Sequence, residues 1–204
     1  LYTEYAAVVD AYGAKYVDFD IEGAAVADKA SVDRRSQALA RLQQSHPGLE
    51  NSLTPPVVPE GLTSDGRNVV PAAKNAGVDL DLVNVMAMDY YRSVDYGDAA
   101  VQAAQSTHDQ LKTLYPGRTD AQLWAMVGVT EMPGIDDYGK PETFTEADAT
   151  TVLNWAKSKG INEISMWASQ RDNGGCVGKA GADNCSGISQ TTWYFSKKWE
   201  PFSG

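Results

Sequence analysis

The sequence predicts an α/β fold of the (β/α) barrel type. Strand-like and helix-like segments alternate along the chain, and two of the expected strands, residues 82–88 and 123–129, are apolar runs typical of buried parallel strands. Polar side chains such as Glu22, Asp89 and Glu131 gather where the expected strands end, which is the functional face of such a barrel. An open doubly wound sheet is the rival architecture. No glycine-rich phosphate loop follows any strand, so the usual nucleotide ligand of that rival is not expected.

The expected elements follow one another in β-α order. A helix ends near Tyr12 and a strand of alternating acidic and apolar residues follows at 16–22. Helices are expected over 31–45, 65–76, 95–114, 145–159 and 190–199, and further strands over 49–54, 82–88, 123–129 and 161–167. Ser31 is the expected N-cap of its helix, and Pro116-Gly117 closes the longest helix. Acidic residues open the helix at 145–159 and lysines close it, which complements the helix dipole.

Composition favours one acidic globular domain over residues 1–204. The 204 residues are 43% hydrophobic, enough for a real core, and the formal net charge is −10. There is no basic stripe, so we expect no nucleic-acid partner, and no apolar run approaches the roughly 20 residues that span a bilayer. No initiating Met and no signal peptide are present, so we expect a mature protein or a fragment. The oligomeric state is left open.

The segment 16–23 carries the strongest chemical signal. On a strand, Asp18, Asp20 and Glu22 would share one face, where their mutual repulsion favours retention of at least one proton at neutral pH. This arrangement suits a site that pairs a proton donor with a carboxylate that stays ionised, on a strand buried within the protein. An exposed acidic edge strand is the alternative. A calcium loop is rejected, because Lys29 stands where an EF-hand needs a bidentate Glu.

These residues resemble a known family. Asp18-Phe19-Asp20-Ile21-Glu22 is similar to the core of the Asp-x-x-Asp-x-Asp-x-Glu signature of glycoside hydrolase family 18, the chitinases. Residues 83–90, 127–134 and 164–172 resemble, in the right order, the sixth, seventh and eighth barrel strands of that family, and residues 185–188 resemble the approach to the last helix of bacterial members. Two positions depart from the pattern: Lys15 replaces the first Asp of the signature, and Met88 replaces the Tyr that precedes Asp89.

The resemblance implies a substrate-assisted glycosidase that acts on chitin or chito-oligosaccharides without a metal or cofactor. Glu22 is expected to be the general acid, Asp20 to orient the substrate acetamido group, and Asp18 to share a proton with Asp20. Further substrate contacts are expected from Met86, Asp89 and Trp167, with Tyr90 or Tyr91 replacing the missing Tyr. Glu131 and Arg171 either contact sugar or pair with each other. A non-catalytic chitin-binding relative and an endo-N-acetylglucosaminidase acting on N-glycans remain the alternatives.

The resemblance also implies that the chain covers only the last five units of a (β/α)8 barrel. The signature strand is the fourth of eight in the family, yet only about 15 residues precede it here, so the first three units are expected to be missing. The chain is therefore expected to be either a fragment or a truncated family member. The strand at 16–22 would then be an open sheet edge.

Cys176 and Cys185, the two cysteines, flank a glycine-rich loop. Their spacing suits a local disulfide, and with no other Cys or His nearby a zinc site is not expected. A disulfide points to an oxidising compartment, so we expect a secreted protein. His46 and His108 are expected on the surface, and the aromatic residues of 193–199 are expected to pack a helix on the outside of the barrel.

Overall fold

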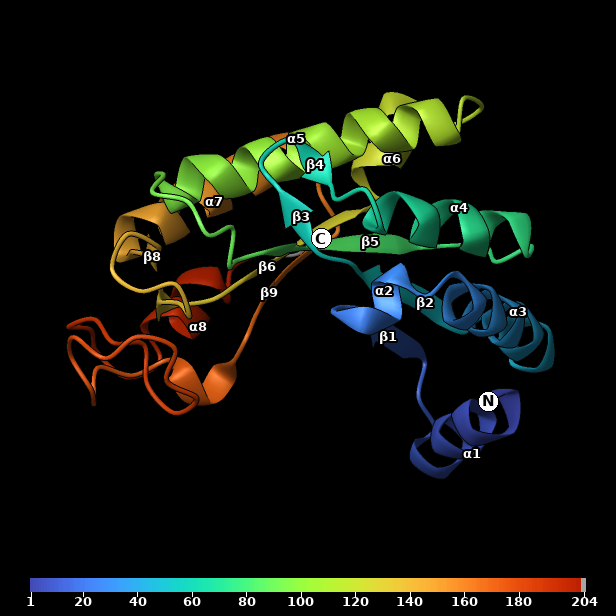
Figure 1. Ribbon diagram of the computed structural model, residues 1–204, viewed down its shortest axis with the longest axis horizontal. Helices are drawn as coiled ribbons and strands as arrows, with labels where there is room; N and C mark the ends of the chain where they lie inside the picture. The colour runs from blue at the N-terminus through green and yellow to red at the C-terminus, as the bar shows by residue number, and fades with distance from the viewer. Residues whose placement is uncertain (203–204) are drawn as a thin grey trace. The chain divides into compact units, whose positions relative to one another are not determined.

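The computed structural model describes residues 1–202, which fold as two compact units (Figure 1). The first unit comprises Leu1–Pro56 and Leu62–Asn84, and the second comprises Val57–Gly61 and the chain from Val85 onward. Strand β5 (Leu82–Ala87) runs through the point of division. None of the described helices is both long and apolar enough to cross a membrane.

The first unit is built on parallel strands. It contains α1 (Tyr2–Tyr12), β1 (Tyr16–Asp20), α2 (Ala24–Ala27), α3 (Lys29–Ser45), β2 (Glu50–Thr54), α4 (Gly66–Asn75) and the start of β5. Strand β1 pairs with β2 in parallel, with Asp18 opposite Ser52 and Asp20 opposite Thr54, and β2 pairs in parallel with β5. The strands therefore have the parallel pairing that the alternating sequence predicts.

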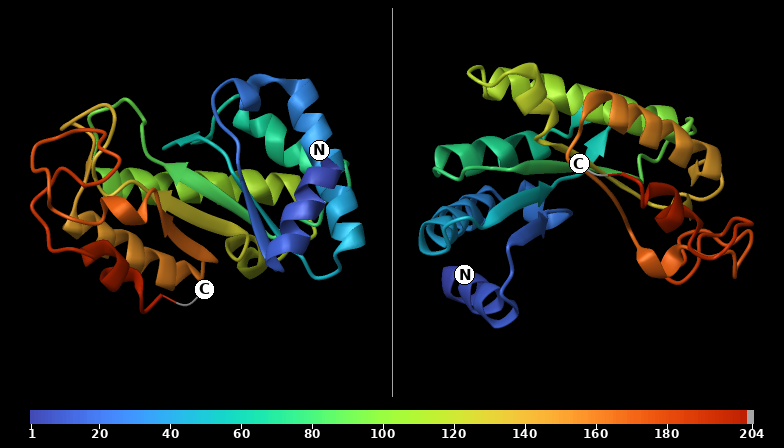
Figure 2. Two further views of the ribbon diagram at one scale, coloured as in Figure 1. Left: turned by 90° about the horizontal axis from the view of Figure 1, so that it is seen from below. Right: turned by 180° about the vertical axis from the view of Figure 1, so that it is seen from behind.

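Helix α1 covers the apolar side of β1. Val9 of α1 packs with Leu42 of α3 and with Leu49, and Val17 of β1 packs against this buried cluster. The ring of Tyr5 lies 5.0 Å from that of Phe19, centroid to centroid. Figure 2 shows α1 beside β1 in both views. The side chains that alternate with the acidic residues are thus the ones that hold β1 to its helix.

The prediction of a fully buried β1 is wrong. Its residues alternate between exposed and half-buried, and β1 is the last strand in the order β1-β2-β5. The strand also ends at Asp20, so Glu22 lies beyond it. Strand β1 is the open sheet edge that the resemblance implies, because only β2 pairs with β1 among the described residues.

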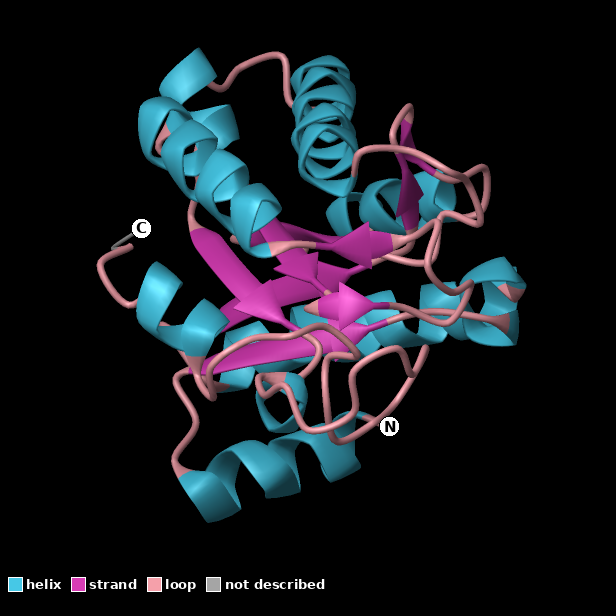
Figure 3. Cartoon of the chain, turned by 90° about the vertical axis from the view of Figure 1, so that its left-hand side faces the viewer, coloured by secondary structure: helices cyan, strands magenta, loops and turns pink. Residues whose placement is uncertain are grey.

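The second unit continues the pattern. It contains α5 (Tyr96–Leu114), α6 (Asp120–Trp124), β6 (Val127–Glu131), α7 (Glu146–Lys159), β9 (Glu163–Met166), the 3-10 turn η1 (Ser169–Arg171) and α8 (Tyr194–Trp199). The strand order is β5-β6-β9, and β6 and β9 are parallel, with Thr130 opposite Ser165. Figure 3 draws the strands in magenta and the helices in cyan. Helix α7 packs against α5 and α8, and the rings of Phe144, Phe195 and Trp199 fill the interior beside α8.

Two short two-stranded ribbons were not predicted, of which the β7–β8 ribbon is antiparallel. Strands β3 (Val57–Val58) and β4 (Gly61–Leu62) form one, and β7 (Gly134–Ile135) and β8 (Thr143–Phe144) form the other. Each strand is only two residues long, too short for a period-2 pattern to be visible in the sequence.

Other differences from the expected elements have local causes. The segment expected as a strand over 123–129 begins inside α6, which Thr119 opens with a capping box, and the strand itself starts at Val127. Asp28, not Ser31, caps α3 by accepting a hydrogen bond from the Ala30 N–H. His108 is not a surface residue: it is 3% exposed and its ring stacks on Trp124 with centroids 3.9 Å apart.

Gly134 generates a prediction about the β7–β8 ribbon. Its φ of 84° lies in the left-handed region, and a Cβ there would run into the carbonyl group of Ser186, which accepts a hydrogen bond from the Ile135 N–H. We expect Gly134→Ala to destabilise the protein by about 2 kcal/mol more than Gly139→Ala. Gly139 is the matched control because its φ of 104° is also left-handed but its surroundings are open. Equal losses in urea denaturation would contradict this packing.

Candidate active site

Asp18 and Asp20 of β1, with Glu22 just beyond the strand, form a row of carboxylates at its carboxyl end, called the acidic row below. Asp18 and Asp20 extend from the same face, and Glu22 follows Ile21, which is 1% exposed and whose N–H donates to the Thr54 carbonyl at 3.1 Å. The Thr54 hydroxyl donates to the Asp18 carboxylate, with both carboxylate oxygens 2.8 Å from Thr54 Oγ1. Asp18 is thus oriented by β2, and Asp18, Asp20 and Glu22 are all exposed to solvent.

The three carboxylates interact electrostatically. Partial burial, followed by the negative charges of Glu22 and then Asp18, raises the pKa of Asp20 above its ordinary value of 3.8. A carboxyl group that keeps a proton to higher pH beside two acidic neighbours is what a proton-sharing pair requires. The row can therefore combine a hydrogen-bond donor and an ionised acceptor on one face of β1.

In the second unit, the segment after β5 carries several of the predicted binding residues. Met86 is half-buried within β5, Met88 is 8% exposed, and Asp89 is half-buried with a left-handed φ of 51°. Tyr90 is only 5% exposed and its ring stacks on Tyr96, whereas Tyr91 is 64% exposed. Of the two tyrosines suggested to replace the one missing at Met88, Tyr91 is therefore the one open to a ligand.

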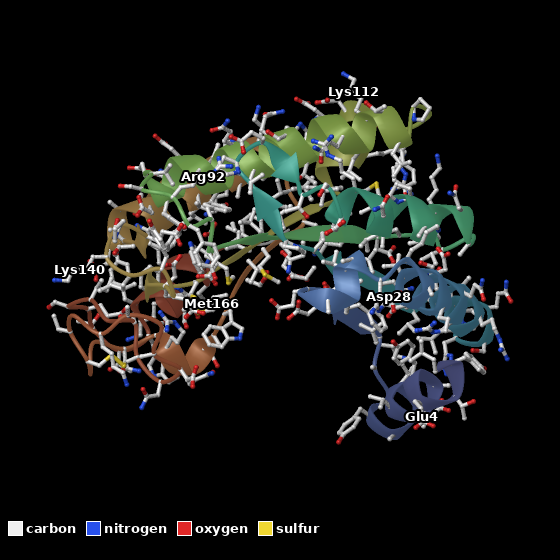
Figure 4. The ribbon with its side chains drawn as sticks, viewed as in Figure 1. Glu4, Asp28, Arg92, Lys112, Lys140 and Met166 are labelled. Atoms are coloured by element: carbon white, nitrogen blue, oxygen red, sulfur yellow. A yellow bond between two sulfur atoms is a disulfide. The ribbon has the colours of Figure 1, made fainter. Side chains whose placement is uncertain are left out.

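Asp89 belongs to a carboxylate group that the sequence did not reveal. Asp89, Asp136 and Glu142 each offer an oxygen within 4.8 Å of the others, a spacing that a metal ion could also bridge. Backbone N–H groups already bind them: Asp89 N donates to Asp136 Oδ2, Asp137 N to Asp89 Oδ1, and Arg92 N to Glu142 Oε1 at 2.6 Å. The group thus anchors the segment after β5 to the β7–β8 ribbon, near the labelled Arg92 of Figure 4.

This carboxylate group holds a proton. Burial, followed by the hydrogen bond and charge of Glu142, raises the pKa of Asp136 to about 8. A proton on Asp136 reduces the repulsion among three carboxylates, of which Asp136 and Glu142 are buried. The one signal in the sequence is the acidic residues either side of the turn at Gly139-Lys140, directly after the segment that resembles the seventh strand.

Glu131 and Arg171 do not pair with each other. Glu131 is fully buried on the same side of β6 as Val127 and Val129, and neither carboxylate oxygen has a hydrogen-bond partner within the described chain. Burial, and to a lesser extent the charge of Asp148, raises the pKa of Glu131 well above its ordinary value. Glu131 therefore holds its proton more tightly than a solvent-exposed glutamic acid does, and it lies in the protein interior away from solvent.

Arg171 connects loop segments by donating hydrogen bonds to their backbone carbonyl groups. It is fully buried, and its guanidinium donates to the carbonyl groups of Pro133 at 3.0 Å, Ile135 at 2.9 Å, and Ala182. Its guanidinium carbon also lies 5.7 Å from the ring centroid of Trp167, which is 41% exposed at the end of β9. The structure therefore gives Arg171 a supporting position beneath Trp167, and leaves Trp167 accessible for stacking on a sugar.

The predicted disulfide is present. Cys176 and Cys185 are bonded, with their Cα atoms 5.9 Å apart, in the loop that follows η1. The Gly178 N–H donates to the Gly187 carbonyl group within the same loop. In the chain-entropy model a bridge of this size contributes roughly 2–3 kcal/mol. It restricts the same region of the chain that Arg171 holds through the Ala182 carbonyl group.

Stability measurements can distinguish a structural role of Arg171 from a role in sugar binding. Arg171→Lys removes the planar fork that serves three carbonyl groups, and we expect it to destabilise the protein by about 3 kcal/mol. Arg34→Lys is the control, because the Arg34 side chain is 64% exposed. Both are measured by chemical denaturation. Unchanged stability in Arg171→Lys together with weakened sugar binding would show that Arg171 contacts sugar instead.

The raised pKa of Asp20 predicts a pH-dependent gain in stability for Asp20→Asn. Because the folded protein holds this proton more tightly than the unfolded chain, the resulting stabilisation is full below the unfolded pKa and is lost as pH rises through the folded pKa. Asparagine does not ionise, so the melting temperature of Asp20→Asn should rise relative to that of the unsubstituted protein between pH 3 and pH 7. A difference that shrinks over this range would contradict the raised pKa.

Comparison with known proteins identifies relatives of one kind. No family model matches the chain. The chain is 37% identical over 186 residues to a probable bifunctional chitinase/lysozyme of Escherichia coli (strain K12) and 36% identical over 186 residues to endochitinase 11 of Metarhizium anisopliae. Both matches cover 84% of this chain, but only 21% and 35% of the respective relatives. The chain thus spans about a third or less of the length of these curated relatives.

Solved structures agree with the sequence matches. The catalytic domain of a hyperthermophilic chitinase from Pyrococcus furiosus aligns with a TM-score of 0.89 and 32% identity, over 98% of this chain and 64% of that one. Mutants of active domain 2 of the thermostable chitinase of that organism, complexed with chito-oligosaccharides, align with the same TM-score at 31% identity. The α/β fold with parallel strands thus matches part of a chitinase catalytic barrel. The chain is therefore a homologue of part of the catalytic domain of these chitinases.

Proposed function

We propose that this chain is the catalytic part of a chitinase, which hydrolyses β-1,4-linked N-acetylglucosamine polymers. The observation that carries the proposal is the solvent-facing row of Asp18, Asp20 and Glu22 at the carboxyl end of β1, in a chain homologous to chitinases. An exposed row of repelling carboxylates makes no contribution to packing, so a catalytic use accounts for it better than a structural one.

Glu22 is proposed as the general acid and base. Its carboxyl group gives a proton to the glycosidic oxygen while the bond from that oxygen to the anomeric carbon breaks. The acetamido oxygen of the same sugar bonds to the anomeric carbon and forms an oxazolinium intermediate. Water then attacks that carbon, the Glu22 carboxylate takes the proton from this water, and the acetamido bond breaks. Two displacements at one carbon retain the β configuration.

Asp20 and Asp18 are proposed to act on the acetamido group. Asp20 accepts a hydrogen bond from the acetamido N–H, and its charge stabilises the positive charge that develops there in the transition state. Asp18 shares the proton of the pair, and the Thr54 hydroxyl, 2.8 Å from both of its carboxylate oxygens, keeps it in place. The proximity of Asp18 and Glu22 to Asp20, which helps to raise the Asp20 pKa, supports this arrangement.

In the second unit we propose that Trp167 stacks on a sugar ring and that Met86 and Asp89 contribute further sugar contacts. Trp167 is 41% exposed at the end of β9 and lies over the buried Arg171 guanidinium, so its ring is accessible to a sugar and held from below. We also propose that the protein is secreted, because the Cys176–Cys185 disulfide persists in an oxidising environment.

Replacement of the proposed acid tests this function. We expect Glu22→Gln to lower the rate of hydrolysis of a chromogenic chitotriose substrate at least about a hundredfold, because the amide cannot transfer the proton. Oligosaccharide binding should persist. Glu4→Gln is the control, since Glu4 is an exposed residue of α1 (Figure 4) and should leave the rate unchanged.

Two other outcomes would overturn the proposal. Full activity in Glu22→Gln would remove Glu22 from the mechanism. Saturable binding of chito-oligosaccharides without any turnover by the unsubstituted protein would instead favour the non-catalytic chitin-binding relative, and release of glycans from a glycoprotein without chitin cleavage would favour the endo-N-acetylglucosaminidase.

A further inference from the structure

Two exposed tyrosines of the second unit contact each other beside Asp89. Tyr91 is 64% exposed and Tyr138 is 49% exposed, yet their rings lie edge to face with centroids 5.7 Å apart. Tyr91 follows β5 and Tyr138 belongs to the turn between β7 and β8, so residues nearly 50 positions apart form one aromatic surface. Single large apolar side chains are commonly exposed on protein surfaces. Two exposed rings that contact each other across two loops instead form a continuous surface of the kind that marks an interaction site.

The backbone turns Tyr91 outward at a conformational cost. Asp89 and Tyr91 both adopt left-handed φ angles, 51° and 57°, which residues other than glycine seldom adopt. Tyr90 between them is buried against Tyr96, so the two unusual angles place successive tyrosines on opposite sides of the chain. Strained backbone of this kind concentrates at binding sites.

Asp136 fixes both tyrosine-bearing segments. Its Oδ2 accepts from the Asp89 N–H at 3.2 Å and its Oδ1 accepts from the Tyr138 N–H at 3.3 Å. The Asp89 carboxylate in turn accepts a hydrogen bond from the Asp137 N–H at 3.2 Å. Because Asp136 is 1% exposed, this junction is buried beneath the tyrosines and sets their relative position before any ligand arrives.

We propose that Tyr91 and Tyr138 form a sugar subsite of this chain, which holds one pyranose ring of a chito-oligosaccharide beside Asp89. The inference rests on the proposed function and deepens it by naming residues that bind the polymer. A pyranose ring presents an apolar C–H face and equatorial hydroxyl groups, which match a tyrosine ring with neighbouring carboxylates. Asp89 and the exposed Asp137 supply those acceptors.

The electrostatics of Tyr91 agree with this placement. The charge of Asp89 is the largest of the causes that raise the pKa of Tyr91, with smaller effects from Asp137 and Glu142. The ring of Tyr91 therefore lies close to Asp89, and a sugar that covers the ring can reach the carboxylate with its hydroxyl groups.

Calorimetric titration with chitohexaose tests the subsite, in a Glu22→Gln background so that the ligand is not consumed. Tyr91→Ala and Tyr138→Ala should each weaken binding about tenfold, because the stacking surface is lost. Tyr91→Phe keeps the ring and should stay within about threefold of the parent. Tyr12→Ala is the matched control, since Tyr12 is an 84% exposed tyrosine of α1. Thermal unfolding of every variant should match the parent, because both tyrosines are exposed.

Unchanged affinity in both alanine variants would overturn the subsite, as would an equal loss in Tyr12→Ala. A loss that accompanies a lowered melting temperature in both alanine variants would show that the pair is structural, which also overturns it. These failures leave the proposed function intact as long as the unsubstituted protein hydrolyses chito-oligosaccharides. If that protein neither binds nor hydrolyses them, the proposed function fails, and the subsite fails with it.

Discussion

The candidate chemistry depends on the pairing of β1 with β2. Strand β1 has β2 as its strand partner, and the parallel register places Asp18 opposite Ser52 and Asp20 opposite Thr54. A slip of one residue would turn the carboxylates toward α1 and the apolar residues toward solvent. Two contacts of Thr54 oppose such a slip: its hydroxyl binds Asp18, and its carbonyl group accepts the Ile21 N–H. In this arrangement partial burial, ahead of the charges of Glu22 and Asp18, raises the pKa of Asp20.

In the second unit, buried polar side chains hold the loops in place. Arg171 binds three carbonyl groups, and Asp172 accepts hydrogen bonds from Phe195 N and Ser196 N at the start of α8. Asp136 joins the segment after β5 to the β7–β8 ribbon. Backbone groups supply most of the hydrogen-bond partners of these buried side chains, which is the condition under which burial of polar groups is tolerated. The loops that carry the accessible residues Trp167, Tyr91 and Tyr138 are thus held in place by buried polar side chains.

The sequence predicted most of the elements and the acidic row, because both appear as local patterns. Alternating acidic and apolar residues indicate β1, the Pro116-Gly117 stop indicates the end of α5, charged residues at both ends indicate α7, and the spacing of two cysteines indicates the disulfide. It did not predict the roles of Asp136, Glu142 and Arg171, since each role arises from contacts with residues far away in the chain. Burial of an arginine or a histidine such as His108 is likewise decided by tertiary packing.

The central claim is that Glu22 and the substrate's own acetamido group cleave the glycosidic bond at the end of β1. Its most direct test is the configuration of the first product, followed by proton NMR during the first minutes of chito-oligosaccharide hydrolysis, before the anomers equilibrate. Substrate-assisted displacement predicts that the β anomer appears first. Initial formation of the α anomer would require direct attack by water and would contradict the account.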